Sequence, residues 1–162
     1  MPVFETLLPG VRHLQNIHPL VVHFPIAFLV GAALFYFLGW MFRNQTFAAT
    51  GFLLLIIGTV TAGAAVGTGL YGEEGVMVSR SVREHLLEAH EKLMLVTLGL
   101  SVVLTAWALV ARPFPKKKRI FFFFLLLVLL GFMTVGADYG ARMVYDYNAG
   151  GNACSQPIEF NK

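Results

Sequence analysis

Long apolar stretches separated by short polar ones dominate the chain. Four of them are long enough to cross a membrane as helices, which takes about 20 apolar residues, and they cover residues 19–42, 47–70, 83–111 and 120–140. Backbone N–H and C=O groups in lipid must be hydrogen-bonded within a helix or a closed β-barrel. The short alternating segments typical of a membrane β-barrel do not occur in the sequence, so the spans should be helices. The pattern predicts an all-α fold, an integral membrane four-helix bundle that forms a single domain over residues 1–162.

Both ends of the chain depart from this pattern. Residues 1–17 carry apolar side chains at helical spacing, which predicts a short interfacial amphipathic helix rather than a cleaved signal peptide. Residues 148–162 are polar and glycine-rich and should form an irregular outer tail. The tail contains Cys154. Because it is the single cysteine of the chain, an internal disulfide and a metal site built of several cysteines are excluded. A bond to another subunit and an uninvolved thiol both stay open for it.

Charge placement predicts the orientation in the membrane. The chain is 57% hydrophobic and 13% charged. The two short loops at 43–46 and 112–119 hold no acidic residue, and all nine carboxylates lie on the other side of the predicted bundle. Short loops rich in Lys and Arg stay in the cytoplasm. We therefore expect a multi-pass membrane protein with both termini on the outer side, in a periplasm-like compartment. The basic run at 116–119 fits a topology signal or a lipid contact, and no nucleic-acid partner is expected.

Two histidine pairs with the same five-residue spacing open the first and third spans. His18 and His23 begin one span, and His85 and His90 begin the other. Ionisable side chains near hydrocarbon usually face a protein interior or a cofactor. Residues five apart lie about 140° apart around a helix, so neither pair can grip one ion alone. On the third span His85 falls on the polar face, whereas His90 points with the leucines.

These placements lead to a cofactor hypothesis. We expect His23 and His90 to face each other across the bundle and to ligate a haem b iron, or another metal, from both sides. A hydrogen bond to Asp138 is the alternative for either ring. Local hydrogen bonds and a supporting role near the cofactor edge both stay open for His18 and His85.

Arginines and small residues complete the candidate site. Arg83 and Arg142 are the candidate partners of the haem propionates, with neutralisation of nearby carboxylates as the alternative. Pro25 should bend the first span just below His23. The Gly63-x-x-x-Gly67 pattern predicts close helix packing, with a seat for a planar ring as the second choice.

Three segments together resemble a known family. The segment His18-Pro-Leu-Val-Val-His23-Phe-Pro-Ile-Ala matches an I-H-P-x-x-V-H-F-P-I-A opening, and Ala89-His90-Glu-Lys-Leu extends the likeness. Residues 140–147 resemble a G-G-x-L-V-Y ending, with Ala141 where the second glycine stands. The chain thus resembles a bacterial family of four-span membrane proteins of uncharacterised function, of the domain of unknown function 2231 type. Related domains are joined to c-type cytochrome segments in some bacteria, which implies respiratory electron transfer. The resemblance also implies that the membrane is the bacterial inner membrane, with both termini on its periplasmic side.

The favoured hypothesis is a membrane-embedded b-type cytochrome subunit that carries electrons at the periplasmic face of a respiratory or electron-transfer complex. Its partners would be the lipid bilayer, other membrane subunits, and a periplasmic c-type cytochrome or a quinone-linked complex. No catalytic nucleophile, phosphate loop or carboxylate dyad is evident, so the protein is not expected to be an enzyme alone. The alternatives are a cofactor-free structural or assembly subunit and a histidine copper or zinc site. Transport comes last, because only the fourth span carries a carboxylate at membrane depth.

Overall fold

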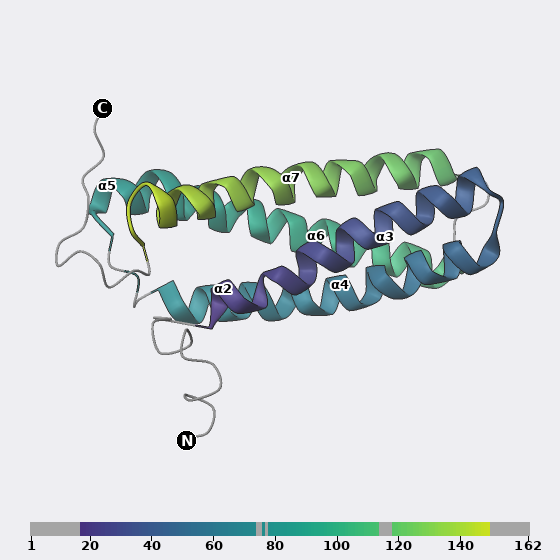
Figure 1. The fold of residues 1–162 in the computed structure, drawn as a ribbon, viewed down its shortest axis with the longest axis horizontal. Helices are drawn as coiled ribbons and strands as arrows, with labels where there is room; N and C mark the ends of the chain where they lie inside the picture. Colours follow the sequence, from purple (N-terminus) through teal and green to yellow (C-terminus); the bar gives the residue numbers. More distant parts are fainter. Residues whose placement is uncertain (1–16, 74–75, 77, 114–117, 150–162) are drawn as a thin grey trace, which may run out of the picture.

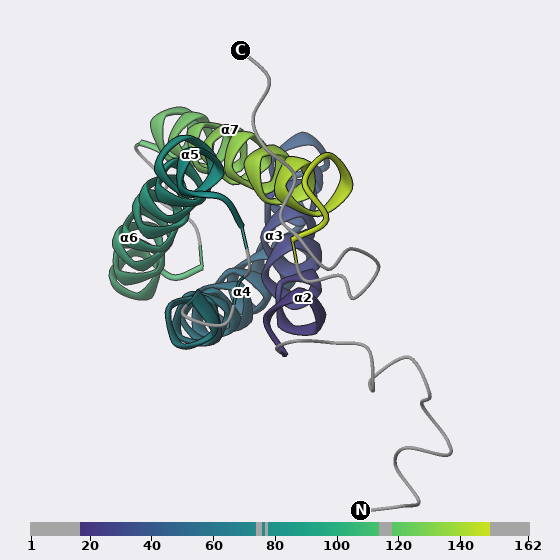
Figure 2. The same cartoon turned by 90° about the vertical axis from the view of Figure 1, so that its left-hand side faces the viewer.

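Four long helices run alternately up and down in a bundle (Figure 1). The computed structural model describes residues 17–73, 76, 78–113 and 118–149. The four predicted spans are confirmed as helices long and apolar enough to cross a membrane, at His18–Met41, Gln45–Gly72, Arg80–Ala111 and Arg119–Tyr145. The expected interfacial helix, the tail beyond residue 149 and Cys154 lie outside the described residues. Seen end-on, the helices surround a common axis (Figure 2).

The first span is broken near its start. It consists of α2 (His18–Val21) and α3 (His23–Met41), with Val22 between them. Pro25 has no N–H to donate to the carbonyl of Val21, and its ring crowds that carbonyl. The break therefore falls just before His23, close to the predicted bend.

The second span, α4 (Gln45–Gly72), packs closely on α3. Glycine makes this contact possible, because a Cβ on Gly51 would lie 2.9 Å from the Tyr36 backbone nitrogen, and one on Gly58 would lie 2.8 Å from Leu29 Cδ2. Gly63 and Gly67 have nothing within 4 Å of a Cβ placed on them. Within the described part of the chain, the expected close helix packing is therefore not seen at the Gly63-x-x-x-Gly67 pattern.

The first and second spans form one helical hairpin, and the third and fourth spans form a second one, which begins with a composite helix. Its first turns are α5 (Arg80–Val82) and the π-helical turn η3 (Arg83–Leu87), followed by α6 (Glu88–Ala111). Ser79 caps the start by accepting a hydrogen bond from the Val82 N–H. The last helix, α7 (Arg119–Tyr145), packs on α6 and continues beyond the predicted end at residue 140.

Apolar and hydroxyl side chains join the two hairpins. Tyr36 of α3 is fully buried, and its ring meets Phe122 of α7 edge-on at 5.2 Å between centroids. The Tyr36 hydroxyl donates to the Pro113 carbonyl at 3.0 Å. Deeper in the bundle, the Thr59 and Thr105 hydroxyls are 2.8 Å apart and link α4 to α6. These contacts satisfy polar groups that lipid could not satisfy.

Charged residues separate to the two ends of the bundle. One end carries basic residues alone among the described positions, namely Arg43, Arg112, Lys118 and Arg119. The other end carries all six described carboxylates, Glu73, Glu84, Glu88, Glu91, Asp138 and Asp146, together with Arg80, Arg83, Lys92 and Arg142. The histidines lie at this second, acidic end.

The glycine contacts between α3 and α4 predict a pair of opposite mutational effects. Gly51→Ala should destabilise the bundle by about 1–3 kcal/mol, because its Cβ would meet backbone rather than a flexible side chain. Gly63→Ala, on the same helix where a Cβ meets nothing within 4 Å, should leave stability unchanged or raise it by up to about 1 kcal/mol. Thermal unfolding of both variants in one detergent measures the difference, and equal shifts would contradict this packing.

Candidate functional site

His18 is held by the second span. It is the first residue of α2, and its Nδ1 donates to the carbonyl of Ala65 in α4 at 2.9 Å. The same nitrogen lies 3.3 Å from Thr68 Oγ1, and the Thr68 hydroxyl donates to the Ala65 carbonyl at 3.0 Å. A carbonyl can only accept, so Nδ1 of His18 must carry a proton. The half-buried ring is thus fixed on the inner side of α4.

His90 is held in the same way by the fourth span. It lies near the start of α6, is half-buried, and its Nδ1 donates to the carbonyl of Gly136 in α7 at 2.7 Å. Nδ1 must again carry the proton, which places the lone pair of the neutral ring on Nε2. Each hairpin therefore contains one imidazole that is hydrogen-bonded to its own second helix.

A glycine lies four residues after each accepting carbonyl. Gly69 follows Ala65 and Gly140 follows Gly136 at this spacing, and a Cβ would lie 3.0 Å from His18 Cε1 and 3.1 Å from His90 Cε1, respectively. Side chains on a helix tilt towards its N-terminus, so residue i+4 covers the carbonyl of residue i. Glycine at i+4 leaves that carbonyl open to a second donor. In both hairpins, a glycine thus leaves room for the histidine that donates to the carbonyl one turn earlier.

The two imidazoles meet between the hairpins. Their ring centroids are 6.2 Å apart, and the ring planes are nearly perpendicular at 85°. Two imidazoles bound to opposite sides of one metal, with bonds of about 2.0 Å as in zinc sites, have centroids about 6 Å apart. Metal-binding histidines commonly donate their other N–H to a backbone carbonyl, which fixes the tautomer and the ring orientation. Both rings here have that hydrogen bond and that spacing.

His23 does not take part in this contact. Its side chain is exposed on the outside of α3, on the same face as Ala27, Val30 and Leu34. The prediction that these residues share a face is confirmed, but the expectation that the face points inward is wrong. His18, five residues earlier, is the histidine of the first span that faces His90.

The remaining candidates lie around the pair. His85 is exposed, and its Nδ1 donates to the Ser81 carbonyl one turn earlier at 2.8 Å. Arg83 forms an ion pair with Glu73 at 2.7 Å and donates to the Glu73 and Val76 carbonyls, so it fastens the loop after α4. Arg142 lies 3.7 Å from Asp146, one turn later on α7.

The donor set at the histidine pair is small. Among the residues that the structure describes, no three His, Cys, Asp or Glu side chains converge as a metal cluster. A cofactor that brings ligands of its own, as a haem does with its porphyrin nitrogens, would need only the two imidazoles from the protein.

Comparison with known proteins identifies the family. The chain matches the family described as "Predicted membrane protein (DUF2231)" over residues 14–153, and it belongs to that family. No curated protein matches the chain, and no solved structure matches it.

The two glycines beside His18 and His90 predict how the rings respond to an added side chain. Gly69→Ala and Gly140→Ala should each displace the facing imidazole and weaken its hydrogen bond to the carbonyl, since the new Cβ lies tighter against the ring than ordinary packing allows. Nitrogen-15 NMR of labelled histidine should show the Nδ1–H form for His18 and His90 in the parent and a changed signal in the matching variant. Gly67→Ala and Gly131→Ala, whose Cβ atoms meet nothing, should leave both signals in place, and a change there would contradict the assignment.

Proposed function

We propose that this member of the DUF2231 family is a membrane-embedded b-type cytochrome in which His18 and His90 ligate the haem iron and the protein passes electrons at its acidic end. The observation that carries the proposal is the approach of the two imidazoles to 6.2 Å, each with Nδ1 hydrogen-bonded to a helix carbonyl. That arrangement directs the lone pair to Nε2, the nitrogen through which each ring would bind iron.

The donor set favours haem over a bare ion. Zinc sites in proteins use three or four side-chain ligands, and the described residues bring only two imidazoles together here. A bis-histidine haem needs no further protein ligand. When bound, haem would supply one-electron chemistry, and His18 and His90 would hold it through their Nε2 atoms in an apolar surrounding that tunes the potential.

The site lies where an external partner could reach it. His18 is the first residue of the first span, so the imidazole pair is at one end of the bundle rather than at its centre. By the distribution of Lys and Arg, this end faces the periplasm of a bacterial inner membrane. Six carboxylates against four basic side chains among the described residues make it net acidic. An acidic surface suits a basic redox partner such as a periplasmic c-type cytochrome, since complementary charge speeds encounter.

A set of four single variants tests the ligand assignment. The parent, purified in mild detergent from cells supplied with haem, should show a b-type α band in the reduced-minus-oxidised spectrum, with about one haem per chain. His18→Ala and His90→Ala should each abolish the band. His23→Ala and His85→Ala are the matched controls at the same end of the same helices, and both should retain it.

Other outcomes separate the alternatives. Loss of the band in His23→Ala with retention in His18→Ala would contradict the ligand assignment while leaving a cytochrome. A colourless protein that retains copper or zinc, with the metal lost in His18→Ala, would favour a histidine metal site. A protein without colour or metal after haem supply would leave a structural or assembly subunit.

A further inference from the structure

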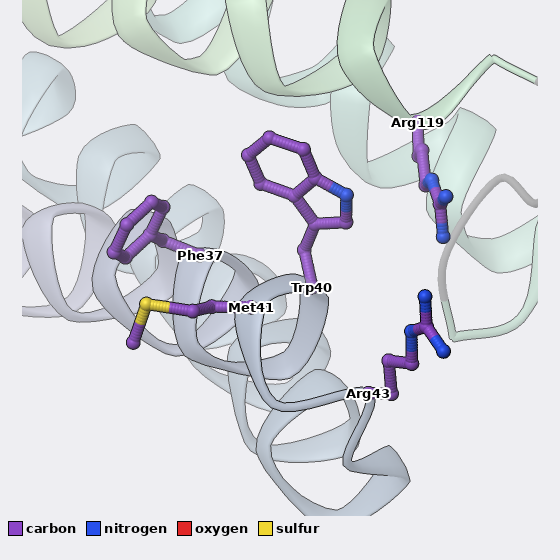
Figure 3. A pocket seen from close by; sticks show the side chains of 5 residues that line it. All are labelled: Phe37, Trp40, Met41, Arg43 and Arg119. Carbon is purple, nitrogen blue, oxygen red and sulfur yellow. The ribbon is translucent and has the colours of Figure 1, made fainter.

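A second feature with the chemistry of a binding site lies at the opposite, basic end. A surface pocket of about 310 Å³ is lined by Phe37, Trp40, Met41, Arg43 and Arg119. Arg43 lies in the loop between α3 and α4, whereas Arg119 is the first residue of α7. The two guanidinium groups point towards each other across the mouth of the pocket, beside the Trp40 ring (Figure 3).

Among the described residues, no acidic side chain forms an ion pair with either guanidinium group. The sequence contains no Asp or Glu at positions 6–72 or 92–137, which include all of α3 and the first two-thirds of α7. The described carboxylates lie at the other end of the bundle. Two converging arginines repel each other unless an anion lies between them. Since no described residue supplies an anion for this gap, one from outside the chain would fit it.

The backbone at Arg43 is unusual for an arginine. Its φ is 50°, in the left-handed region that favours glycine. It follows Phe42, the C-cap of α3, and the next residue, Asn44, closes the helix by donating its N–H to the Gly39 carbonyl at 3.1 Å. Glycine is the common residue at this position. An arginine here keeps a long basic side chain at the pocket at some conformational cost.

The other half of the pocket is apolar and open to the surroundings. Phe37, Trp40 and Met41 are 37%, 40% and 51% exposed. Trp40 is braced by Phe123 of α7 at 6.4 Å between ring centroids. Tryptophan concentrates at the level of the lipid headgroups, where its ring contacts acyl chains and its N–H reaches polar groups. The pocket therefore joins a basic mouth to an apolar floor at one membrane interface.

We propose that this pocket binds an anionic phospholipid. Its phosphate lies between Arg43 and Arg119, because guanidinium groups match phosphate oxygens in a two-pronged geometry. The upper part of an acyl chain lies along Phe37 and Trp40. Basic pockets between transmembrane helices recognise anionic headgroups in this manner. The lipid would bridge the first and second hairpins at the end that the histidine pair does not join.

Binding of defined lipids to the purified full chain tests the proposal. Native mass spectrometry in detergent, titrated with phosphatidylglycerol, should show saturable binding that is at least about tenfold tighter than that of phosphatidylcholine with the same acyl chains. Arg43→Gln and Arg119→Gln should each weaken phosphatidylglycerol binding about fivefold. The double variant should bind the two lipids alike.

The matched control removes the same charge from the same end. Arg112→Gln combined with Lys118→Gln takes away two positive charges outside the pocket, and it should retain the preference for phosphatidylglycerol. Equal losses in the two double variants would overturn the proposal, because binding would then follow net charge. Inorganic phosphate that competes at the same concentration as the lipid would also overturn it. Thermal unfolding in phosphatidylcholine verifies that both double variants are folded. Arg43→Lys retains the positive charge but loses the planar guanidinium group, so it should also weaken phosphatidylglycerol binding.

Discussion

The contact between His18 and His90 is the interaction on which the acidic end of the bundle depends. Each ring is hydrogen-bonded to the second helix of its own hairpin, through the carbonyl of Ala65 in one case and of Gly136 in the other. The rings then meet between the hairpins at 6.2 Å. Buried polar groups in lipid must find partners within the protein. Both Nδ1 atoms do so without breaking a helix, because a carbonyl can accept a second donor where glycine leaves it uncovered.

Most of the fold was predictable from the sequence. In a membrane the backbone must satisfy its own hydrogen bonds, so a long apolar run leaves little choice but a helix, and residues 19–42 or 120–140 are such runs. It was harder to predict which face of each helix points into the bundle and which faces the lipid. Lipid tails are as apolar as a protein interior, so the outer face of α3, with Val30 and Leu34, resembles an inner face in sequence. Helical periodicity therefore identifies shared faces here without saying which one is inside.

The candidate site shows the same limit in detail. His90 was placed inward because Glu84, Glu88 and Glu91 mark the wet side of its helix, and the structure has it inward. His23 has no polar neighbours to mark a side, and its face points outward. The useful signal was elsewhere, in Gly69 and Gly140, each four residues after a carbonyl that accepts from a histidine. These glycines can be recognised only once the helix pairs are known, because each lies beside a histidine that is distant in the sequence. The π-helical turn at Arg83–Leu87 also could not be anticipated from a uniform 100° per residue.

The separation of charge along the bundle gives its two ends different chemistry. Ionisable groups become more costly the deeper they lie in hydrocarbon, so both sets of charges remain near an interface. At the acidic end, the described carboxylates lie at the same end of the bundle as two imidazoles that donate to backbone carbonyls, and a cofactor held there, as we propose, could be reached from solution. At the basic end, Arg43 and Arg119 converge with no carboxylate in the adjoining sequence, so an anion between them would relieve their repulsion. The membrane itself provides such anions in the headgroups of its lipids. The apolar helices separate the two ends, so the cofactor site that we propose at one end and the lipid site that we propose at the other do not compete for the same residues.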